Sequence, residues 1–561
     1  MKKLLLIILF FCIKQVNSQT TVPGGYVYGT WTLAGSPYLI QGGILVPNDS
    51  TLTINPGVVV EFQGHDKLFC KGRILALGAV SDSITFTIAS SSSSTGWWGI
   101  RFDSTANTND TSKFFYCKVQ YGNANASSGN DAHGGGFFFN DFSKCIISNC
   151  NISNNNAMYG GGAIYCTSSS PIIKNSSITN SYSYNGGEGI DCENNSHTII
   201  DNNFISGGNI YFENSSLTIT NNTISSGNTV CSICCWNASS IISNNIIESN
   251  ICTNGGNGGA ILLNNSSSTI TYNKICNNSS VGISYGNQTG VVTNVTISNN
   301  IIANNTSVNG FGGGAISLYN ASPTLINNTI CYNKSSGNGG ALYCDNGSKP
   351  SIYNSILYGN TSALSGNQIY LNDQYSQPPI YNCNIQGGTS AFGLNGNVYV
   401  GTYSNNIDFN PSFVAPSAGS GNSFNGLIAN WSLQSNSPCI NAGNPTGSYP
   451  ATDIAGNPRV YGSIIDIGAY EYQGLVGIKQ LSIENTQINI YPNPTSSNFT
   501  IETINIEKQT LQVFDVTGKM VLNQSVEGKT TIDVTSLSEG VYNLSLINST
   551  GVINKKLVIV R

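Results

Sequence analysis

The chain has 561 residues and a formal net charge of −5, and only 9% of its residues are charged. No arginine lies between Arg101 and Arg459, which argues against a nucleic-acid-binding surface. The low charge instead suits a surface that meets neutral, hydroxyl-rich partners.

The first 18 residues have the pattern of a secretory signal peptide. Lys2 and Lys3 precede an apolar run from Leu4 to Ile13, and small residues follow as far as Ser18. We therefore expect residues 1–18 to be removed on export. No other apolar run is long enough to span a bilayer, so no transmembrane segment is expected.

Residues 19–130 contain short strand-like runs separated by glycine-containing turns. Examples are TLTINPGVVVEF from Thr51, ITFTI from Ile84 and GWWGIRF from Gly96. This region is predicted to form an N-terminal cap and the first coils of a repeat structure.

Residues 131–400 hold ten copies of one phrase, a glycine turn followed by a short apolar strand. GGGAIYCTS from Gly160 and GGAISLYNA from Gly313 are two of them. The first apolar position recurs with a mean step of about 26 residues, which is typical of a solenoid. It is occupied by Phe137, Ile164, Ile190, Ile210, Ile233, Ile261, Ile283, Ile316, Leu342 and Ile369.

The composition of these copies favours a right-handed parallel β-helix over a leucine-rich repeat. They lack an LxxLxL core and are rich in Ile, Asn, Ser, Thr and Gly, with strand-like alternation. The residue two positions after the first column is also mostly apolar, so both columns are expected to point inward. The steps of 20 and 33 residues around Ile210 and Ile316 are either a missing turn and an inserted loop, or errors of alignment.

Asparagine recurs in phase with the strands, and we expect it at bends because Asn tolerates left-handed backbone. Stacked coils would align these side chains in a ladder. The column is Asn149, Asn175, Asn202, Asn221, Asn244, Asn273, Asn299, Asn327, Asn354 and Asn382.

Fifteen cysteines remain after the signal peptide. Cys166, Cys192, Cys235 and Cys344 fall in an inward column that also holds Leu and Phe, so buried thiols acting as small hydrophobes are expected. A bridge between Cys166 and Cys192 in adjacent coils is the alternative.

Residues 401–472 are predicted to close the last coil, with Trp431, Tyr470 and Tyr472 as bulky cover. Residues 473–487 form a predicted linker. Residues 488–561 contain strand runs such as LQVFDVTGKMV from Leu511, with six or seven strands in total, and are expected to form a small Ig-like β-sandwich.

These features carry two resemblances. The strands of residues 22–472 resemble bacterial secreted right-handed β-helix proteins with a pectate-lyase-like solenoid, and the GGAI phrases resemble those of polymorphic outer-membrane proteins. Residues 488–561, with INIYPNPTSSNFTIE from Ile488, closely resemble the type A C-terminal sorting domain of the Bacteroidetes type IX secretion system. That resemblance implies contact with the type IX machinery and delivery to the cell surface or medium.

Polysaccharide lyases and hydrolases share this predicted fold, but the chemistry they need is poorly represented. There is no Arg between residues 134 and 400 to act as the base of an elimination, and the NTD, DD, GHG and RIK signatures of galacturonases are absent. No cofactor is predicted other than a possible Ca²⁺ ion.

One acidic patch, defined as Asp191, Glu193 and Glu213, is the candidate for catalysis or for Ca²⁺ binding. Asp191 and Glu193 share the outward face of one strand, and Glu213 takes the position of Glu193 in the next coil. Carboxylates this close repel one another unless they are solvated, protonated or bridged by a cation. The interpretations are a solvated surface, a cation or sugar site, or a catalytic pair.

The same face carries an aromatic column of Phe138, Tyr165, Tyr211, Tyr343 and Tyr370. Tyr165, Tyr211, Tyr343 and Tyr370 are the candidate ligand-binding residues, because tyrosine rings can stack on sugars. The alternative is that the rings stack only on each other.

The leading hypothesis is an exported β-helix protein that binds a polysaccharide or a host surface without catalysis, as an adhesin does. A polysaccharide lyase or glycoside hydrolase acting on the outward face is the first alternative. A structural stalk with no specific ligand is the second.

Overall fold

The computed structural model describes residues 19–561 except 90–94, 185, 253–257, 289–292, 309, 311, 445–448, 463, 475–488, 503–507, 516–518 and 549–550. The expected signal peptide lies outside the described residues, as does the expected linker apart from residues 473 and 474. The chain divides into two compact units, Met1–Gly474 and Leu475–Arg561.

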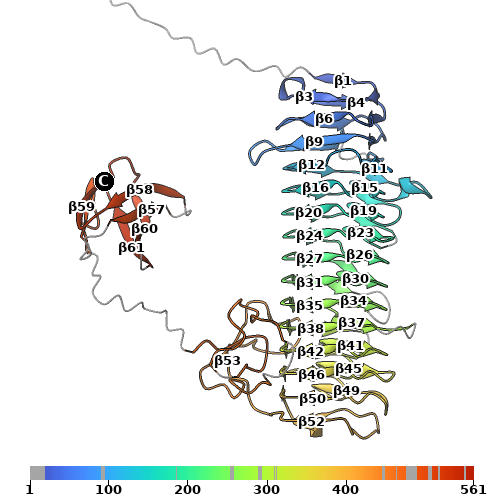
Figure 1. Cartoon of the computed structure of the whole chain (residues 1–561), viewed down its shortest axis with the longest axis vertical. Helices are drawn as coiled ribbons and strands as arrows, with labels where there is room; N and C mark the ends of the chain where they lie inside the picture. The colour runs from blue at the N-terminus through green and yellow to red at the C-terminus, as the bar shows by residue number, and fades with distance from the viewer. Residues whose placement is uncertain are drawn as a thin grey trace, which may run out of the picture. The chain divides into compact units, whose positions relative to one another are not determined.

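The first unit is a right-handed parallel β-helix whose coils stack as three long sheets (Figure 1). Sheet A has 15 strands, β1 Thr20–Val22, β4 Tyr38–Ile40, β7 Val59–Phe62, β10 Ile84–Ile88, β13 Cys117–Gln120, β17 Asn151–Ser153, β21 Ser177–Thr179, β25 Phe204–Ser206, β28 Thr223–Ser225, β32 Ile246–Glu248, β36 Lys274–Cys276, β39 Ile301–Ala303, β43 Thr329–Cys331, β47 Ile356–Tyr358 and β51 Asn384–Ile385.

Sheet B has 14 strands, β2 Gly25–Tyr26, β5 Ile44–Val46, β8 Leu68–Cys70, β11 Ile100–Asp103, β15 Phe137–Asn140, β19 Ile164–Thr167, β23 Ile190–Glu193, β26 Ile210–Glu213, β30 Ile233–Trp236, β34 Gly259–Asn264, β37 Val281–Gly286, β41 Ile316–Tyr319, β45 Leu342–Asp345 and β49 Ile369–Leu371.

Sheet C has 15 strands, β3 Gly29–Trp31, β6 Thr51–Ile54, β9 Arg73–Leu77, β12 Ser112–Phe115, β16 Cys145–Ser148, β20 Ile172–Lys174, β24 Ile199–Asp201, β27 Thr218–Thr220, β31 Ile241–Ser243, β35 Thr269–Thr271, β38 Thr296–Ser298, β42 Thr324–Ile326, β46 Ser351–Tyr353, β50 Ile380–Tyr381 and β52 Tyr403–Ser404.

Short elements occupy the turns between sheets A and B and the ends of the coils. They are the strands β14 Asn123–Ala124, β18 Asn156–Ala157, β22 Tyr182–Ser183, β29 Asn228–Thr229, β33 Ile251–Cys252, β40 Thr306–Ser307, β44 Lys334–Ser335 and β48 Thr361–Ser362, and the 3₁₀ turns η1 Leu33–Gly35, η2 Asn130–Ala132 and η3 Gly388–Ala391.

The strand register confirms both inward columns predicted from the repeat. The ten strands from β15 to β49 place every first-column residue opposite its neighbour, from Phe137↔Ile164 to Leu342↔Ile369. All of these side chains are buried in one continuous core, as are their second-column partners. Burial of such apolar surface contributes about 25 cal/mol per Å² to stability.

The irregular steps are real features of the coils and not alignment errors. The short coil between Ile190 and Ile210 passes from β25 to β26 through Gly207 and Gly208 without a short turn strand. In the long coil, β37 ends at Gly286 and β38 begins at Thr296, whereas β34 ends at Asn264 and β35 begins at Thr269.

The prediction that asparagine takes a left-handed backbone conformation at the bends is confirmed. The ladder of stacked asparagine side chains lies one residue after the bend and not at it. Every Asn of the predicted column has a φ near +50° except Asn273, where Tyr272 takes that conformation instead. In six coils the residue after the bend is a buried asparagine, whose side-chain oxygen accepts a hydrogen bond from a backbone N–H of the previous coil at 2.9–3.0 Å. The members of the ladder are Asn203, Asn222, Asn245, Asn273, Asn300 and Asn328.

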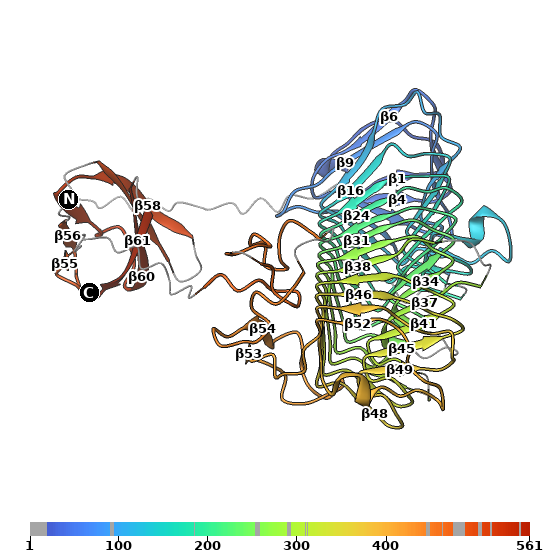
Figure 2. The same cartoon turned by 60° about the horizontal axis from the view of Figure 1, so that its bottom comes forward.

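Residues 401–472 do not cap the last coil as a whole. Phe392, Tyr399 and Tyr403 pack against the end of the core, but residues 413–472 fold back along the outer side of sheet A (Figure 2). There Trp431, in the strand β54 Asn430–Leu433, packs edge-on against Phe413 of the strand β53 Phe413–Ala415 and shares a buried cluster with the sheet A residues Ile301 and Ile356. The expected role of Trp431 as an end cap is therefore wrong, because the cluster that buries it is built on apolar outer residues of sheet A.

The second unit has its own core and seven antiparallel strands in two sheets, in agreement with an Ig-like sandwich. The sheets comprise β55 Asn489–Tyr491, β56 Asn498–Glu502 and β59 Lys529–Asp533, and β58 Met520–Val526, β57 Gln509–Phe514, β60 Gly540–Asn548 and β61 Gly551–Ile559.

The described cysteines are buried thiols, except for one disulfide-bonded pair. Cys166 and Cys192 lie side by side in the core and are not bridged. Cys231 and Cys234 form a disulfide on sheet B, which the sequence did not indicate. Burial raises the pKa of the Cys235 and Cys344 thiols and keeps them protonated, so they act as small apolar side chains.

Candidate functional site on the outward face of sheet B

Two outward columns run along sheet B because strand residues alternate between core and surface. Between β19 and β45, the first column holds Tyr165, Asp191, Tyr211, Cys234, Leu262, Ser284, Ser317 and Tyr343. Over the same strands, the second holds Thr167, Glu193, Glu213, Trp236, Asn264, Gly286, Tyr319 and Asp345. The predicted aromatic and acidic residues all lie on this one face.

Most aromatic rings of the first column pack against one another or against neighbouring segments of the chain. Phe138 stacks on Tyr165 with ring centroids 5.7 Å apart, and Tyr343 stacks on Tyr370 at 5.6 Å. Tyr165 and Tyr370 are only 5% and 6% exposed. These two rings are closed to a ligand, so the alternative of mutual stacking describes them.

The other two predicted tyrosines are half-buried. Gly312 lies against the ring of Tyr343, since a Cβ built there would approach that ring to 2.1 Å. Tyr211 donates a hydrogen bond to Glu213 Oε2 at 3.2 Å. Tyr211 therefore keeps more accessible surface for a ligand than the stacked rings do.

The strand register of the acidic patch is as predicted, but the solvent exposure of its side chains is not. Glu193 and Glu213 are paired across β23 and β26, and both are partly exposed. Asp191 is 1% exposed and its Oδ1 has no hydrogen-bond partner. Gly160 and Gly187 cover this carboxyl, because a Cβ at Gly160 would lie 1.7 Å from Asp191 Oδ2.

The electrostatics of the patch follow from that burial. Desolvation, and then the charges of Glu193 and Glu213, raise the pKa of Asp191 well above its usual range. Burial also raises the pKa of the nearby Glu188 to about 7. The interpretation of the whole patch as solvated surface is thus wrong for Asp191.

The predicted Ca²⁺ ligands are not found as a metal-binding group. Across the part of the chain that the structure describes, no three His, Cys, Asp or Glu side chains are grouped so that they could hold a metal ion. Ca²⁺ binding by Asp191, Glu193 and Glu213 stays a prediction.

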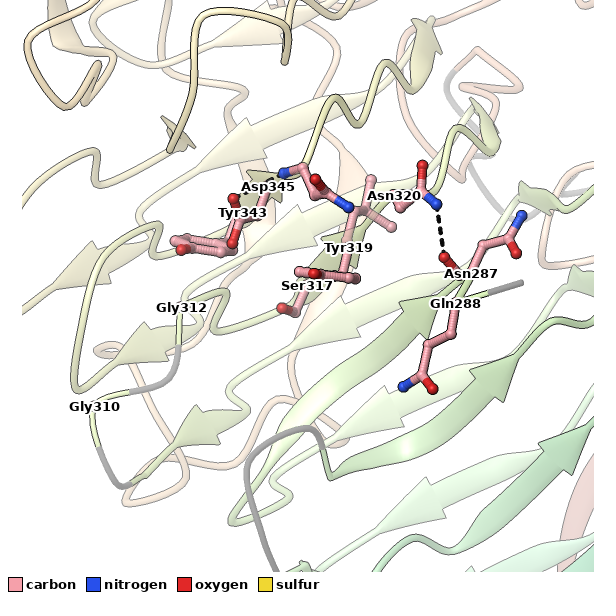
Figure 3. Close-up of a pocket in the computed structure, with 11 residues that line it drawn as sticks. Asn287, Gln288, Gly310, Gly312, Ser317, Tyr319, Asn320, Tyr343 and Asp345 are labelled. Carbon is pink, nitrogen blue, oxygen red and sulfur yellow. Dashed lines mark hydrogen bonds between the residues drawn. The ribbon is translucent and has the colours of Figure 1, made fainter. Parts of the chain in front are cut away.

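A hollow of about 640 Å³ opens further along sheet B, at β41 and β45 (Figure 3). We call it the Tyr319 hollow, and Ser317, Tyr319, Asn320, Tyr343, Asp345 and Gln288 line it. Tyr319 is 47% exposed. It follows Gly286 in the second column, where a Cβ would meet no atom within 4 Å, so the ring is open on the side toward Gly286.

Polar groups border the open ring. Asp345 accepts a hydrogen bond from Asn372 Nδ2 at 2.9 Å, and Asn320 Nδ2 donates to the Asn287 carbonyl at 2.7 Å. An exposed ring beside fixed amides and a carboxylate can bind a hydroxyl-rich ring by stacking and hydrogen bonding. The sequence interpretation missed Tyr319, although its place three residues after Ile316 identifies the column.

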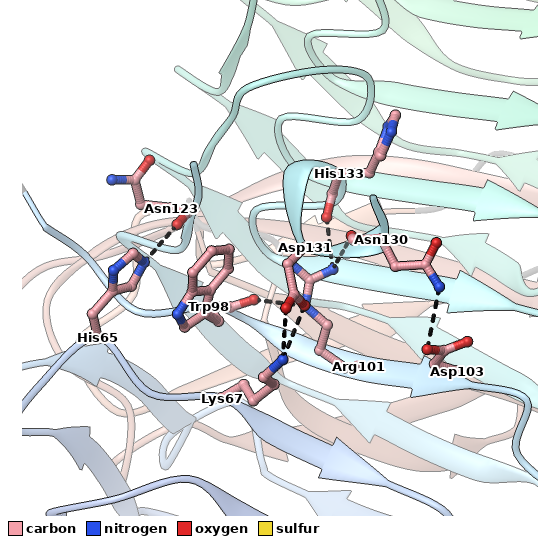
Figure 4. Close-up of polar contacts among 9 residues, drawn as sticks. All are labelled: His65, Lys67, Trp98, Arg101, Asp103, Asn123, Asn130, Asp131 and His133. Carbon is pink, nitrogen blue, oxygen red and sulfur yellow. Dashed lines mark hydrogen bonds and ion pairs between the residues drawn. The ribbon is translucent and has the colours of Figure 1, made fainter. Parts of the chain in front are cut away.

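A second cluster missed from the sequence lies near the N-terminal end of sheet B (Figure 4). The side chain of Arg101 is buried and donates to the carbonyls of Trp98, Asn130 and His133. Asp131 forms an ion pair with Lys67 at 2.9 Å. Since these bonds fasten the η2 turn to the sheet, the cluster supports the loop that contains His133.

This cluster extends the aromatic column. The Arg101 guanidinium lies 4.9 Å from the ring centre of Phe138, and the His133 ring lies 4.4 Å from that of Tyr165. Burial lowers the pKa of Arg101 to about 10, and burial with the charge of Arg101 lowers that of His133. The sequence feature that could have identified this cluster is GWWGIRF, because its Ile100 and Arg101 align with Phe137 and Phe138.

Two family models match the chain. The model described as right handed beta helix region matches residues 135–300, 188–354 and 259–433, which together cover more than half of the sequence. The chain belongs to the right-handed β-helix proteins. The model described as secretion system C-terminal sorting domain matches residues 489–560 of this β-helix protein.

The sorting domain determines where the β-helix protein goes. It marks the chain for handling by the type IX secretion machinery and for delivery to the cell surface or the medium. Among the described residues, no helix is long and apolar enough to cross a membrane.

The solved structures that resemble the β-helix protein do so weakly. A double mutant of the periplasmic alginate epimerase AlgG shares 14% identity over 68% of this chain and 79% of its own, with a TM-score of 0.25. Tailspike protein 2 of the Escherichia coli bacteriophage CAB120 shares 12% identity over 97% of this chain and 64% of its own, with a TM-score of 0.16. No curated protein sequence matches. Neither structure transfers an activity to this chain.

Proposed function

We propose that the chain is an exported, non-catalytic glycan-binding protein of the cell surface, and that the Tyr319 hollow is a sugar-binding site. The observation that carries the proposal is the Tyr319 ring, which is 47% exposed and lies beside Gly286, where a Cβ would meet no atom within 4 Å. Amide, hydroxyl and carboxylate groups border this ring, as a neutral hydroxylated ligand requires.

The position of the hollow supports an adhesin-like role. It lies on the outward side of a rod of stacked coils whose own C-terminal domain directs export. A polymer lying along the second column would meet successive coils about 4.8 Å apart and gain contacts from several of them.

The test is retention of the mature chain on a panel of plant, algal and host polysaccharides. Tyr319→Ala should weaken retention about tenfold, since aromatic contacts of this kind are worth about 1–2 kcal/mol. Gly286→Val should do the same by covering the ring without straining the backbone. Tyr353→Ala is the matched control, because Tyr353 stacks on Tyr381 at 5.3 Å on sheet C, away from the hollow.

Two outcomes would contradict the proposal. Retention unchanged by Tyr319→Ala and Gly286→Val would show that the hollow is not the site. New reducing ends or unsaturated products from any polysaccharide would instead favour the lyase or hydrolase alternative, with Glu193 and Glu213 as the carboxylates to substitute first.

A further inference from the structure

The acidic patch and its neighbours form a surface with negative charge and aromatic rings. Glu193, Glu213 and Trp236 succeed one another along the second column in β23, β26 and β30. Tyr211 lies beside Glu213 and donates to one of its carboxylate oxygens. Within the described residues, the ion pairs of the chain involve none of these carboxylates.

A buried carboxyl group lies beside this surface. Asp191 projects outward between Tyr165 and Tyr211, is 1% exposed, and leaves Oδ1 without a partner. Unpaired buried carboxyl groups are costly unless a cation or a hydrogen-bond donor approaches them. Asp191 therefore adds a demand for a hydrogen-bond donor, and the partly exposed Glu193 and Glu213 add the demand for a cation.

An organic ammonium group fits this surface better than a metal ion. The described carboxylates do not converge as a metal requires. One ammonium has three donors and can bridge two carboxylates on adjacent strands. Its cationic end and the adjacent ring can also face Trp236, since indole is the strongest cation–π partner.

We propose that Glu193, Glu213, Tyr211 and Trp236 bind a protonated amino sugar of a glycan that runs along the outward face of sheet B. This inference rests on the proposed function in taking the ligand to be a carbohydrate. The inference adds the chemical class of that carbohydrate, which is a polymer with free amino groups. The same second column continues through Asn264 and Gly286 to Tyr319, so one chain can reach both sites.

The experiment is calorimetric titration of the mature chain with three oligosaccharides of one length. They are oligomers of glucosamine, which is fully deacetylated, of N-acetylglucosamine and of glucose. The wild type should bind the deacetylated oligosaccharide at least about tenfold more tightly than the other two. Glu193→Gln with Glu213→Gln should remove that preference. The fold should be kept, because glutamine still accepts the hydrogen bonds from Tyr165 and Tyr211.

The control removes two equal charges elsewhere on the rod, with Asp201→Asn on sheet C and Glu248→Gln on sheet A. It should bind as the wild type does. If this control loses the preference equally, the effect is general electrostatics and the inference is wrong. Equal affinity for acetylated and deacetylated oligosaccharides, or a response to calcium alone, would also overturn it.

The two proposals fail in different ways. Loss of neutral glycan binding in Tyr319→Ala with no preference for the amino sugar would leave the proposed function standing and overturn this inference. Absence of binding to every glycan tested would overturn both.

Discussion

The buried carboxyl of Asp191 is the least ordinary residue on the surface of sheet B. Its folded-state pKa is raised by desolvation and by the charges of Glu193 and Glu213. In the unfolded chain an aspartate titrates near its usual value of about 3.9. The unfolded state therefore loses this proton first as pH rises, and the stability that the protonated Asp191 carboxyl contributes decreases between about pH 4 and the folded pKa.

Replacement of Asp191 by asparagine should make the protein more stable at neutral pH. The expected gain is about 1.4 kcal/mol for each pH unit above about 4, up to the folded pKa, and the melting temperature should vary less with pH in that range. Thermal unfolding of the wild type and of Asp191→Asn across that range measures both effects. A variant that melts as the wild type does at every pH would refute the assignment.

At the level of the strand and its turn, the asparagine ladder connects one coil to the next. Asn273 accepts from Asn245 N and donates to the Ile242 carbonyl at 2.8 Å, with its side chain fully buried. Each ladder residue thus satisfies backbone groups that no strand bonds, where the chain turns between sheets C and A.

Asn273→Ala should lower the melting temperature, because it leaves the Asn245 N–H and the Ile242 carbonyl unpaired at about 1–3 kcal/mol each. The control is Asn244→Gly, at an exposed bend with a φ of +57° that glycine adopts freely. Thermal unfolding should show a large loss for the first variant and little for the second. Equal losses would mean that the bend, not the ladder, provides the stability.

The parts of the fold that follow from local periodicity were predictable, and those that depend on packing between distant segments were not. The Ile columns and the left-handed Asn bends repeat with the coil, so their positions follow from spacing alone. The burial of Asp191 depends on glycine turns at Gly160 and Gly187 that fold over it. Arg101 depends on a loop some 30 residues later whose carbonyls it binds.

At the scale of the whole molecule, the β-helix and the sorting domain have separate hydrophobic cores. Residues that form one core do not complete the other, so each unit has what it needs to fold. The export signal can then be read from a small folded domain without disturbing the coils.

Deletion of residues 475–561 should leave the melting transition of the β-helix in place and remove a separate one belonging to the sorting domain. In cells, the truncated chain should accumulate within the envelope instead of reaching the surface. Calorimetry of both chains and surface labelling of intact cells measure these outcomes. A large shift of the β-helix transition would show that the units stabilise each other.

The segment that folds back along sheet A also affects how the coils respond to a pulling force. It is bonded to coils along the rod, through Tyr272 to Thr452, Asn304 to Gly421 and Asn354 to Asn444. Coils in an ordinary solenoid can peel away one at a time under tension. Here the segment ties several together, so a force that unravels the coils from this end must break these bonds at once, and the C-terminal half of the rod should resist unravelling as one block.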